Sequence, residues 1–507
     1  MLPQPGPSSA PLRSRAGKFF RRAAILLGIL YIVLLIPAPE PAPKPNTSQQ
    51  PFAWNQDEFW AELETRFVKA RAAGCDSLAE SIAGAQVRIS QTLDEVSRGP
   101  LPPEDSRFAA LETNLFHLAP LIAACPARVG DFAALANRTR SEVKKQSQSW
   151  DMNSAAARRR VYRLLFGTRM AMEEIMLQSP AGSAPPELML CDNTPSQTPS
   201  IAVRGVKLHS GDILLSRGGA PTSSLIARGN DYPGSFSHVA LAHVDERSGR
   251  ASMIESHIEG GVAITPLDDY LADKKLRILL LRLRPELPAL KADPMLPHRA
   301  ATEALAEARR RHIPYDFSMD HRDHRAQFCS EVAAAAYEPT GVRLWMGLSW
   351  ISSPTVSAWL GSLGVRHFET QEPSDLEYDP QLAVVAEWRD RATLLKAHAD
   401  DAVTDAMLEE AQPGRPLAYN RLSLPAARLA KAWSFVLNRF GKTGPIPEGM
   451  SAATALRVKK FRHDHAARSE QLLVVAAAVQ KSRGYAPLYW ELTRLAREAK
   501  RNGERPR

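Results

Sequence analysis

The stretch from about Val203 to Trp388 constrains the fold of this chain most, because its apolar residues recur with the period of β-strands. The segments "GDILLSRG", "SHVALAHVD", "ASMIESHIEGGVAITPL" and "LRILLLRLRP" each predict strands, and "HRAATEALAEARRRH" predicts a helix between them. On both sides of this stretch the apolar residues recur at helical spacing instead. We therefore expect an α+β domain between two mainly helical regions.

Breaks in composition divide the chain further. The proline-rich "PAPEPAPKPNTSQQP" predicts a stiff linker, and "SPAGSAPPELMLCDNTPSQTPS" predicts a boundary. The charge pairs of the first helical region indicate solvated faces, so that region is expected to be a spacer or a partner-binding module with unassigned partners. The expected segments are 1–22 (basic flank), 23–36 (signal anchor or signal peptide), 37–52 (linker), 53–180 (helical domain), 181–204 (linker), 205–391 (α+β domain) and 392–507 (helical region).

The N-terminus has the composition of a targeting segment. A basic flank precedes an apolar run from Ala23 to Ile36, which is short for a membrane span and typical of a signal-peptide core. The small residues that a signal peptidase would need, Ala38 and Ala42, are each followed by proline. We therefore expect an uncleaved single-pass signal anchor with the body of the protein in a periplasm. The alternative is a soluble periplasmic protein after cleavage.

The net charge of +9 comes from the two ends of the chain. The first 22 residues contribute five basic side chains and no acid, and residues 494–507 contribute six basic side chains against two acids. No basic stripe interleaved with aromatic residues crosses a domain, so a nucleic-acid partner is not expected. Basic ends fit an anionic membrane surface.

Cys329, in "AQFCSEVAAAAYE", stands just before a run from Val332 to Tyr337 that predicts a helix. The first turn of a helix is the positive end of its dipole and favours the thiolate, so we expect a depressed thiol pKa. The alternative is a buried structural cysteine. Of the other cysteines, Cys75 and Cys125 occupy expected helix ends and are a hypothetical disulfide pair.

A nucleophilic cysteine needs a base and a group that orients the base. His238 begins a predicted strand, and Glu255 lies on the next strand, on the same face as His257. A Glu255 oxygen is expected within about 3.2 Å of a His238 ring nitrogen, with His257 as the rival for that place. We expect only one of the two to lie beside the His238 ring.

The pieces "GDILL", the "SH" of "FSHVALAHV", "MIES", "PYDFSMDHRDHRAQFCSEV" and "DPQLAVVAEW" resemble the permuted papain-fold amidases of the YiiX and YebB type, in the NlpC superfamily. The resemblance covers roughly residues 205–390. It implies that Cys329 is the nucleophile, His238 the general base and Glu255 the orienting residue, while Asp316 ties a loop. The family usually has tyrosine where this chain has Phe328, so backbone N–H groups would have to bind the oxyanion.

The resulting expectation is a circularly permuted papain-like cysteine hydrolase that cleaves amide bonds, with cell-wall peptides as the substrate class that the family suggests. A lipid acyl hydrolase or acyltransferase of the same fold is the alternative. An inactive wall- or partner-binding scaffold is the alternative of another class. No cofactor is expected, and no metal site, because His321 with His324 and His463 with His465 lack partner ligands.

Overall fold

The computed structural model describes residues 13–39, 44–45, 48–179 and 187–503. Its centre is a seven-stranded sheet in the order β1-β11-β8-β4-β5-β6-β7, in which every neighbouring pair is antiparallel. The sheet and the helices around it confirm the expected α+β class. The strands are β1 (Leu188–Leu190), β4 (Ile213–Gly218), β5 (His238–Val244), β6 (Ala251–His257), β7 (Gly261–Pro266), β8 (Lys275–Leu283) and β11 (Leu382–Arg389).

The alternation of side chains along each strand gives the sheet two buried faces. Leu215 and Leu241 belong to the face that packs on α11 (Leu296–Arg310) and α12 (Glu331–Tyr337). Their neighbours Leu214 and Ala240 face the other way, toward α9 (Leu267–Ala272) and the hairpin of β2 (Ser200–Val203) and β3 (Val206–His209). The sheet is therefore the middle layer of the domain.

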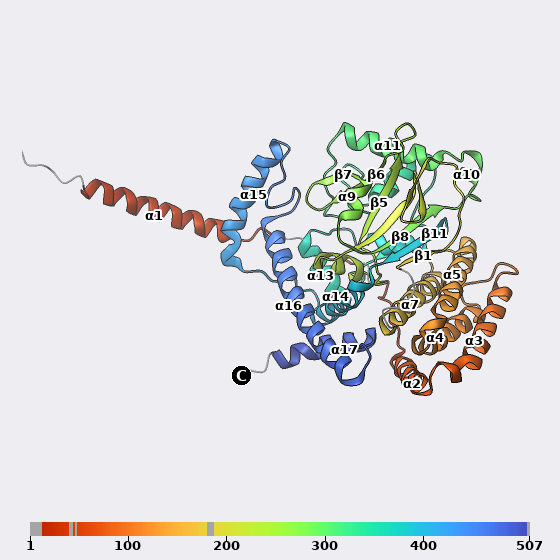
Figure 1. The fold of residues 1–507 in the computed structure, drawn as a ribbon. Helices are drawn as coiled ribbons and strands as arrows, with labels where there is room; N and C mark the ends of the chain where they lie inside the picture. The colour runs from red at the N-terminus through yellow and green to blue at the C-terminus, as the bar shows by residue number, and fades with distance from the viewer. Residues whose placement is uncertain (1–12, 40–43, 46–47, 180–186, 504–507) are drawn as a thin grey trace, which may run out of the picture.

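Helices precede and follow this domain (Figure 1). Cys75 at the start of α3 and Cys125 just after α4 form a disulfide, which confirms the hypothetical pair. The N-terminal group comprises α2 (Asp57–Ala73), α3 (Cys75–Val96), α4 (Ser106–Ala124), α5 (Val129–Gln146), α6 (Ala155–Val161) and α7 (Gly167–Gln178). Within and after the domain come α8 (Pro221–Arg228), α10 (Pro288–Ala292), α13 (Pro354–Leu363), α14 (Arg391–Glu410), α15 (Leu424–Arg439), α16 (Ala452–Arg483) and α17 (Tyr489–Gly503).

Buried ion pairs join the N-terminal helices to the sheet. Arg169 of α7 donates to Glu387 of β11 at 2.7 Å and to both carboxylate oxygens of Glu377. Arg277 of β8 donates to Glu173 of α7 at 2.7 and 2.6 Å. The expectation that charges of this region lie on solvated faces is wrong for these residues. Periodicity places a charge on a helix face but does not say what covers that face.

Part of the expected linker is ordered in strands. Leu188–Leu190 pairs with β11 and forms the edge of the main sheet, and Ser200–Val203 forms β2. Proline and serine favour turns in this segment, but three or four residues between them are enough to pair with an edge strand. The sheet therefore begins before the expected domain boundary at residue 205.

The N-terminal segment forms α1 (Arg13–Leu35), which projects from the rest of the molecule and meets α15 at its base (Figure 1). Within the described residues, no helix combines the length and the apolar character that crossing a membrane demands. The expected membrane anchor is therefore not supported. The apolar run of fourteen residues is about 21 Å long at the helical rise, against about 30 Å for a bilayer core.

Candidate active site

The register of β5 and β6 brings the expected histidine and carboxylate together. Ala240 pairs with Glu255, and continuing this antiparallel register sets His238 opposite His257. Glu255 is then the diagonal neighbour of His238 on the same face of the sheet, within reach of a long side chain. The two strands thus place three polar side chains at one end of the ladder.

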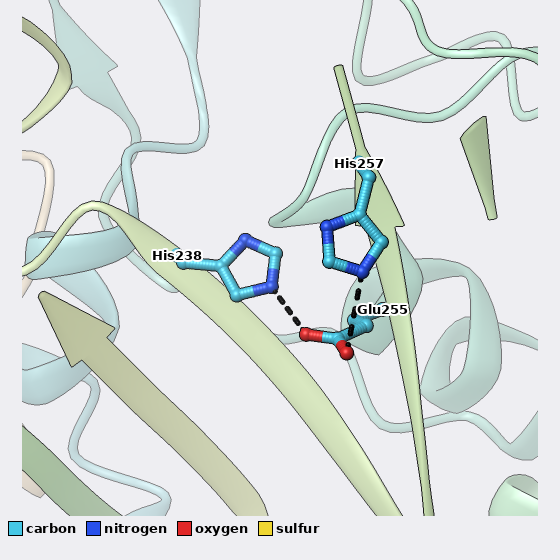
Figure 2. Close-up of side chains that lie close together, drawn as sticks. All are labelled: His238, Glu255 and His257. Atoms are coloured by element: carbon cyan, nitrogen blue, oxygen red, sulfur yellow. Dashed lines mark hydrogen bonds and ion pairs between the residues drawn. The ribbon is translucent and has the colours of Figure 1, made fainter. Parts of the chain in front are cut away.

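The carboxylate of Glu255 contacts both imidazole rings (Figure 2). His238 Nε2 lies 2.7 Å from Glu255 Oε2, and His257 Nε2 lies 3.3 Å from Glu255 Oε1. The two rings stack with 5.5 Å between centroids. The expected contact between Glu255 and His238 is present. The expectation that only one residue can lie beside the His238 ring is wrong, because each histidine takes a different carboxylate oxygen.

The electrostatics of this cluster favour a charged carboxylate. Burial alone would raise the pKa of Glu255, but hydrogen bonds from His238 and His257 hold it well below its usual value. The hydrogen bond to Glu255 in turn raises the pKa of His257, against the opposing effect of burial. Glu255 is therefore a fixed negative charge beside the His238 ring.

The loop that holds Cys329 is fastened to the same strand from the other face. Ser256, between Glu255 and His257, donates its hydroxyl to the carbonyl of Gln327 at 2.6 Å. Gln327 N–H donates to the Pro314 carbonyl at 2.9 Å. Strand β6 therefore positions the carboxylate with one face and the cysteine loop with the other.

Helix α12 begins at Glu331, two residues after Cys329. Phe328 N–H donates to Glu331 Oε2 at 2.9 Å, and His324 Nδ1 lies 3.2 Å from Glu331 Oε1. Burial raises the pKa of Glu331 to about 7, although the hydrogen bonds from His324 and Phe328 oppose it. This carboxylate closes the turn that presents Cys329. Glu331 is a site residue that the sequence pattern does not predict, and its place in "CSE" is the available signal.

Cys329 is 4% exposed, and its sulfur donates to the carbonyl of Ser237 at 3.8 Å. Burial, reinforced by the negative charge of Glu372, raises the pKa of the thiol to about 12. Donors on Ser330 and Val239 act in the opposite direction but are outweighed. The expected depressed pKa is therefore wrong for this structure: desolvation exceeds the effect of a seven-residue helix.

In the structure, His238 thus bonds to Glu255, and the Cys329 sulfur contacts Ser237, the residue before His238. No hydrogen bond joins Cys329 and His238 in the part of the chain that the structure describes. The ring nitrogen His238 Nδ1 likewise has no hydrogen-bond partner among the described residues. One imidazole nitrogen is thus bound to the carboxylate, and the other remains for a reacting proton.

Glu372 is a site residue that the sequence analysis missed. Its side chain is buried, and one carboxylate oxygen has no partner among the described residues. Burial, with a contribution from Asp375, raises the pKa of Glu372 to about 8. The available signal was the acidic "ETQEPSDLEYD" immediately before the last strand of the sheet. At neutral pH this carboxyl is largely protonated and uncharged, so it repels a Cys329 thiolate less than a carboxylate would.

Other expected polar residues have structural contacts. Asp316 accepts hydrogen bonds from Ser318 and from the N–H of Asp320, as expected for a loop tie. His465, one of the histidines for which no metal site is expected, is buried against Asp400 and Thr404. Its face of α16 packs on α14, which the sequence did not reveal.

The described residues include one group with the spacing of metal ligands. His238, Glu255 and His257 each offer a ligand atom, and these atoms lie within 4.8 Å of one another. Two imidazoles and a carboxylate are ligands that zinc accepts. In this arrangement the carboxylate already bonds to both rings, so the geometry is also complete without an ion.

Comparison with known proteins identifies the family that this domain resembles. Residues 207–386 match the family described as "Permuted papain-like amidase enzyme, YaeF/YiiX, C92 family". The match runs from β3 to β11 and includes both histidines, Glu255 and Cys329. A comparison with curated proteins finds no match.

Proposed function

We propose that residues 207–386, which belong to the permuted papain-like amidase family, hydrolyse amide bonds with Cys329 as nucleophile, His238 as general base and Glu255 as the residue that orients the base. The observation that carries the proposal is the 2.7 Å contact of His238 with a buried carboxylate, directly beside the strand end that the Cys329 thiol touches. A nucleophile, a base and an orienting group are the parts of a thiol hydrolase.

His238 Nδ1, which has no partner among the described residues, is the atom that we propose accepts the thiol proton. As the Cys329 sulfur attacks the carbonyl carbon, the thiol proton passes to Nδ1, and Glu255 stabilises the resulting imidazolium through Nε2. The imidazolium then protonates the leaving amine as the C–N bond breaks. Water, activated by the neutral ring, hydrolyses the thioester, releases the acid and restores the thiol.

The resting thiol is neutral in this mechanism. A buried sulfur with a pKa near 12 is protonated at neutral pH, so deprotonation accompanies attack and does not precede it. The Phe328 N–H already donates to Glu331, and the Ser330 N–H interacts with the Cys329 sulfur, so we assign the Cys329 N–H to the oxyanion. The charge of Glu255 matters most in this case, because the imidazolium forms only during the reaction.

For the substrate we propose a peptide amide, with cell-wall peptides as the class. The Cys75–Cys125 disulfide supports work in an oxidising compartment outside the cytoplasm. A lipid acyl group is the second candidate. It is favoured by a cavity of about 660 Å³ that lies between residues 315–318 and the basic side chains Arg428 and Lys431 of α15.

The test is turnover of fluorogenic dipeptide amides and of a fluorogenic phospholipid by the full chain. Cys329→Ser should abolish hydrolysis of whichever substrate is used, while Cys191→Ser, which removes the other free thiol, should retain it. Hydrolysis of the phospholipid alone would select the second candidate. Absence of turnover on both classes, with the fold intact, would support an inactive scaffold and contradict the proposal.

A further inference from the structure

Large apolar side chains are exposed mainly in one part of this molecule. Eleven of them lie on residues 19–36 and six on residues 422–440, against five elsewhere in the described chain. Scattered single apolar residues are ordinary on protein surfaces, but a concentration of this kind marks an interaction surface. The two segments are α1 with Ile36, and α15 with the residues at its ends.

Four of the exposed apolar residues at α15 form a stripe. Leu429, Trp433, Val436 and Phe440 follow one another at intervals of four, three and four, so they share a helix face. Trp433 is 57% and Phe440 is 74% exposed. The core of the molecule is on the opposite side of α15, where Leu424, Ala427 and Ser434 are buried. The helix therefore has an apolar face that the described part of the chain does not cover.

Hydrogen bonds join the end of α1 to the start of α15. Tyr31 donates its hydroxyl to the Leu422 carbonyl at 3.0 Å. Arg428 donates to the carbonyls of Leu34 at 3.0 Å and Ile36 at 2.7 Å, where α1 ends and its carbonyls lack helical partners. The C-terminal end of α1 is therefore held against the start of α15, and Figure 1 shows the two helices meeting there while the rest of α1 projects away.

The chain segment that contains α15 carries charge of a single sign. Between Glu410 and Glu448 the chain has six basic residues and no acidic one: Arg415, Arg421, Arg428, Lys431, Arg439 and Lys442. The sequence before α1's apolar run also has five basic residues and no acid. Trp, Phe and Leu on one face with Lys and Arg beside it is the pattern of helices that lie in a membrane interface. A protein partner would need an apolar patch surrounded by acidic residues to match this segment. Every part of an anionic bilayer surface combines negatively charged headgroups with an apolar layer beneath them.

We propose that α15, together with α1, binds the surface of an anionic lipid bilayer, with Trp433, Val436 and Phe440 in the interfacial layer and Arg439 and Lys442 on the lipid headgroups. The apolar face and the basic charge act together, so binding requires both. This surface is independent of the chemistry of Cys329. It also places the cavity beside Arg428 and Lys431 next to the lipid.

The test is flotation of the full chain with vesicles of phosphatidylcholine alone and of phosphatidylcholine with phosphatidylglycerol. The protein should float with the anionic vesicles, and added salt should reduce the bound fraction. Trp433→Ser combined with Phe440→Ser should lower the partition coefficient by about tenfold or more, because two large side chains no longer enter the interface. Arg439→Gln with Lys442→Gln should weaken binding to anionic vesicles and lessen its salt dependence.

Val474→Ser is the matched control, because Val474 is 67% exposed on α16, outside both segments. It should bind as the unaltered chain does. All these changes are at exposed positions, so thermal midpoints should agree and exclude misfolding. Equal binding by the Trp433/Phe440 variant would overturn the assignment to α15. Failure of the unaltered chain to float, with a dimer in light scattering that this variant abolishes, would show that the face binds a second copy instead.

Discussion

Replacing Arg169 with Met should destabilise the protein strongly, because this side chain holds two buried carboxylates at once. Arg169 is fully buried, and it donates to Glu377 and to Glu387. In the variant, Glu387 would keep its ion pairs with Arg140 (2.7 Å) and Arg389 (2.9 Å). Glu377 would lose the arginine that donates to both of its carboxylate oxygens. Removing one partner of a buried pair costs about 3–5 kcal/mol, mostly through the unpaired charge that remains.

Denaturant unfolding followed by circular dichroism measures the loss as a lower transition midpoint. Arg138→Met is the control, because Arg138 pairs with Asp94 on an exposed part of α5 and α3. An exposed pair contributes about 1 kcal/mol or less. Arg169→Met combined with Glu377→Leu should recover part of the loss, since the unpaired charge disappears. Equal midpoints for the Arg169 and Arg138 variants would refute the role assigned to the buried network.

Four further predictions, on three variants, concern the active site. Glu255→Gln should lower kcat/KM by about two to four orders of magnitude, the range for neutralising the third member of a triad, and unchanged turnover would remove Glu255 from the mechanism. His257→Gln should cost about tenfold or less, because His238 keeps its own carboxylate oxygen. In the folded protein the pKa of His257 is raised from 6.5 and that of Glu255 is lowered from 4.5. The ion pair between them therefore stabilises the fold fully between pH 4.5 and 6.5, and this stabilisation is lost as the pH rises through the raised pKa of His257. The thermal midpoint of His257→Gln should therefore lie below that of the unaltered protein near pH ~6 and approach it near pH ~9, and a constant gap would contradict this coupling. Glu372→Gln should lower the pKa of Cys329, measured as the pH dependence of iodoacetamide labelling, because the carboxyl ionises above pH about 8 and opposes the thiolate.

Much of the catalytic domain follows from patterns that a single sequence contains. Alternation along β6 predicts Glu255 and His257 on one face, and the expected contact of Glu255 with His238 is present at 2.7 Å. The antiparallel register then determines which residues face each other, and it was not deducible from either strand alone. For that reason the sequence presents His257 as a rival of Glu255 for the place beside His238, whereas in the structure His257 binds Glu255.

Burial by distant segments is the property that the sequence concealed. Arg169 and Glu173 have the spacing of an exposed helical pair, but strands β8 and β11 cover them with opposite charges. The thiol of Cys329 was expected to respond to the nearby helix end. Its pKa depends instead on desolvation and on Glu372, which lies 43 residues further along the chain. Both errors arise from contacts between residues far apart in sequence, which local periodicity does not encode.

The central claim is that Cys329 forms a covalent acyl-enzyme with the help of His238, and intact-mass spectrometry of the quenched reaction tests it most directly. With an activated ester or amide substrate, the unaltered chain should gain the mass of one acyl group. Peptide mapping should place that group on Cys329 and not on Cys191, the other free thiol. His238→Gln should slow formation of the adduct and leave its position unchanged. Turnover without an acyl adduct, or an adduct that persists in Cys329→Ser, would contradict the account.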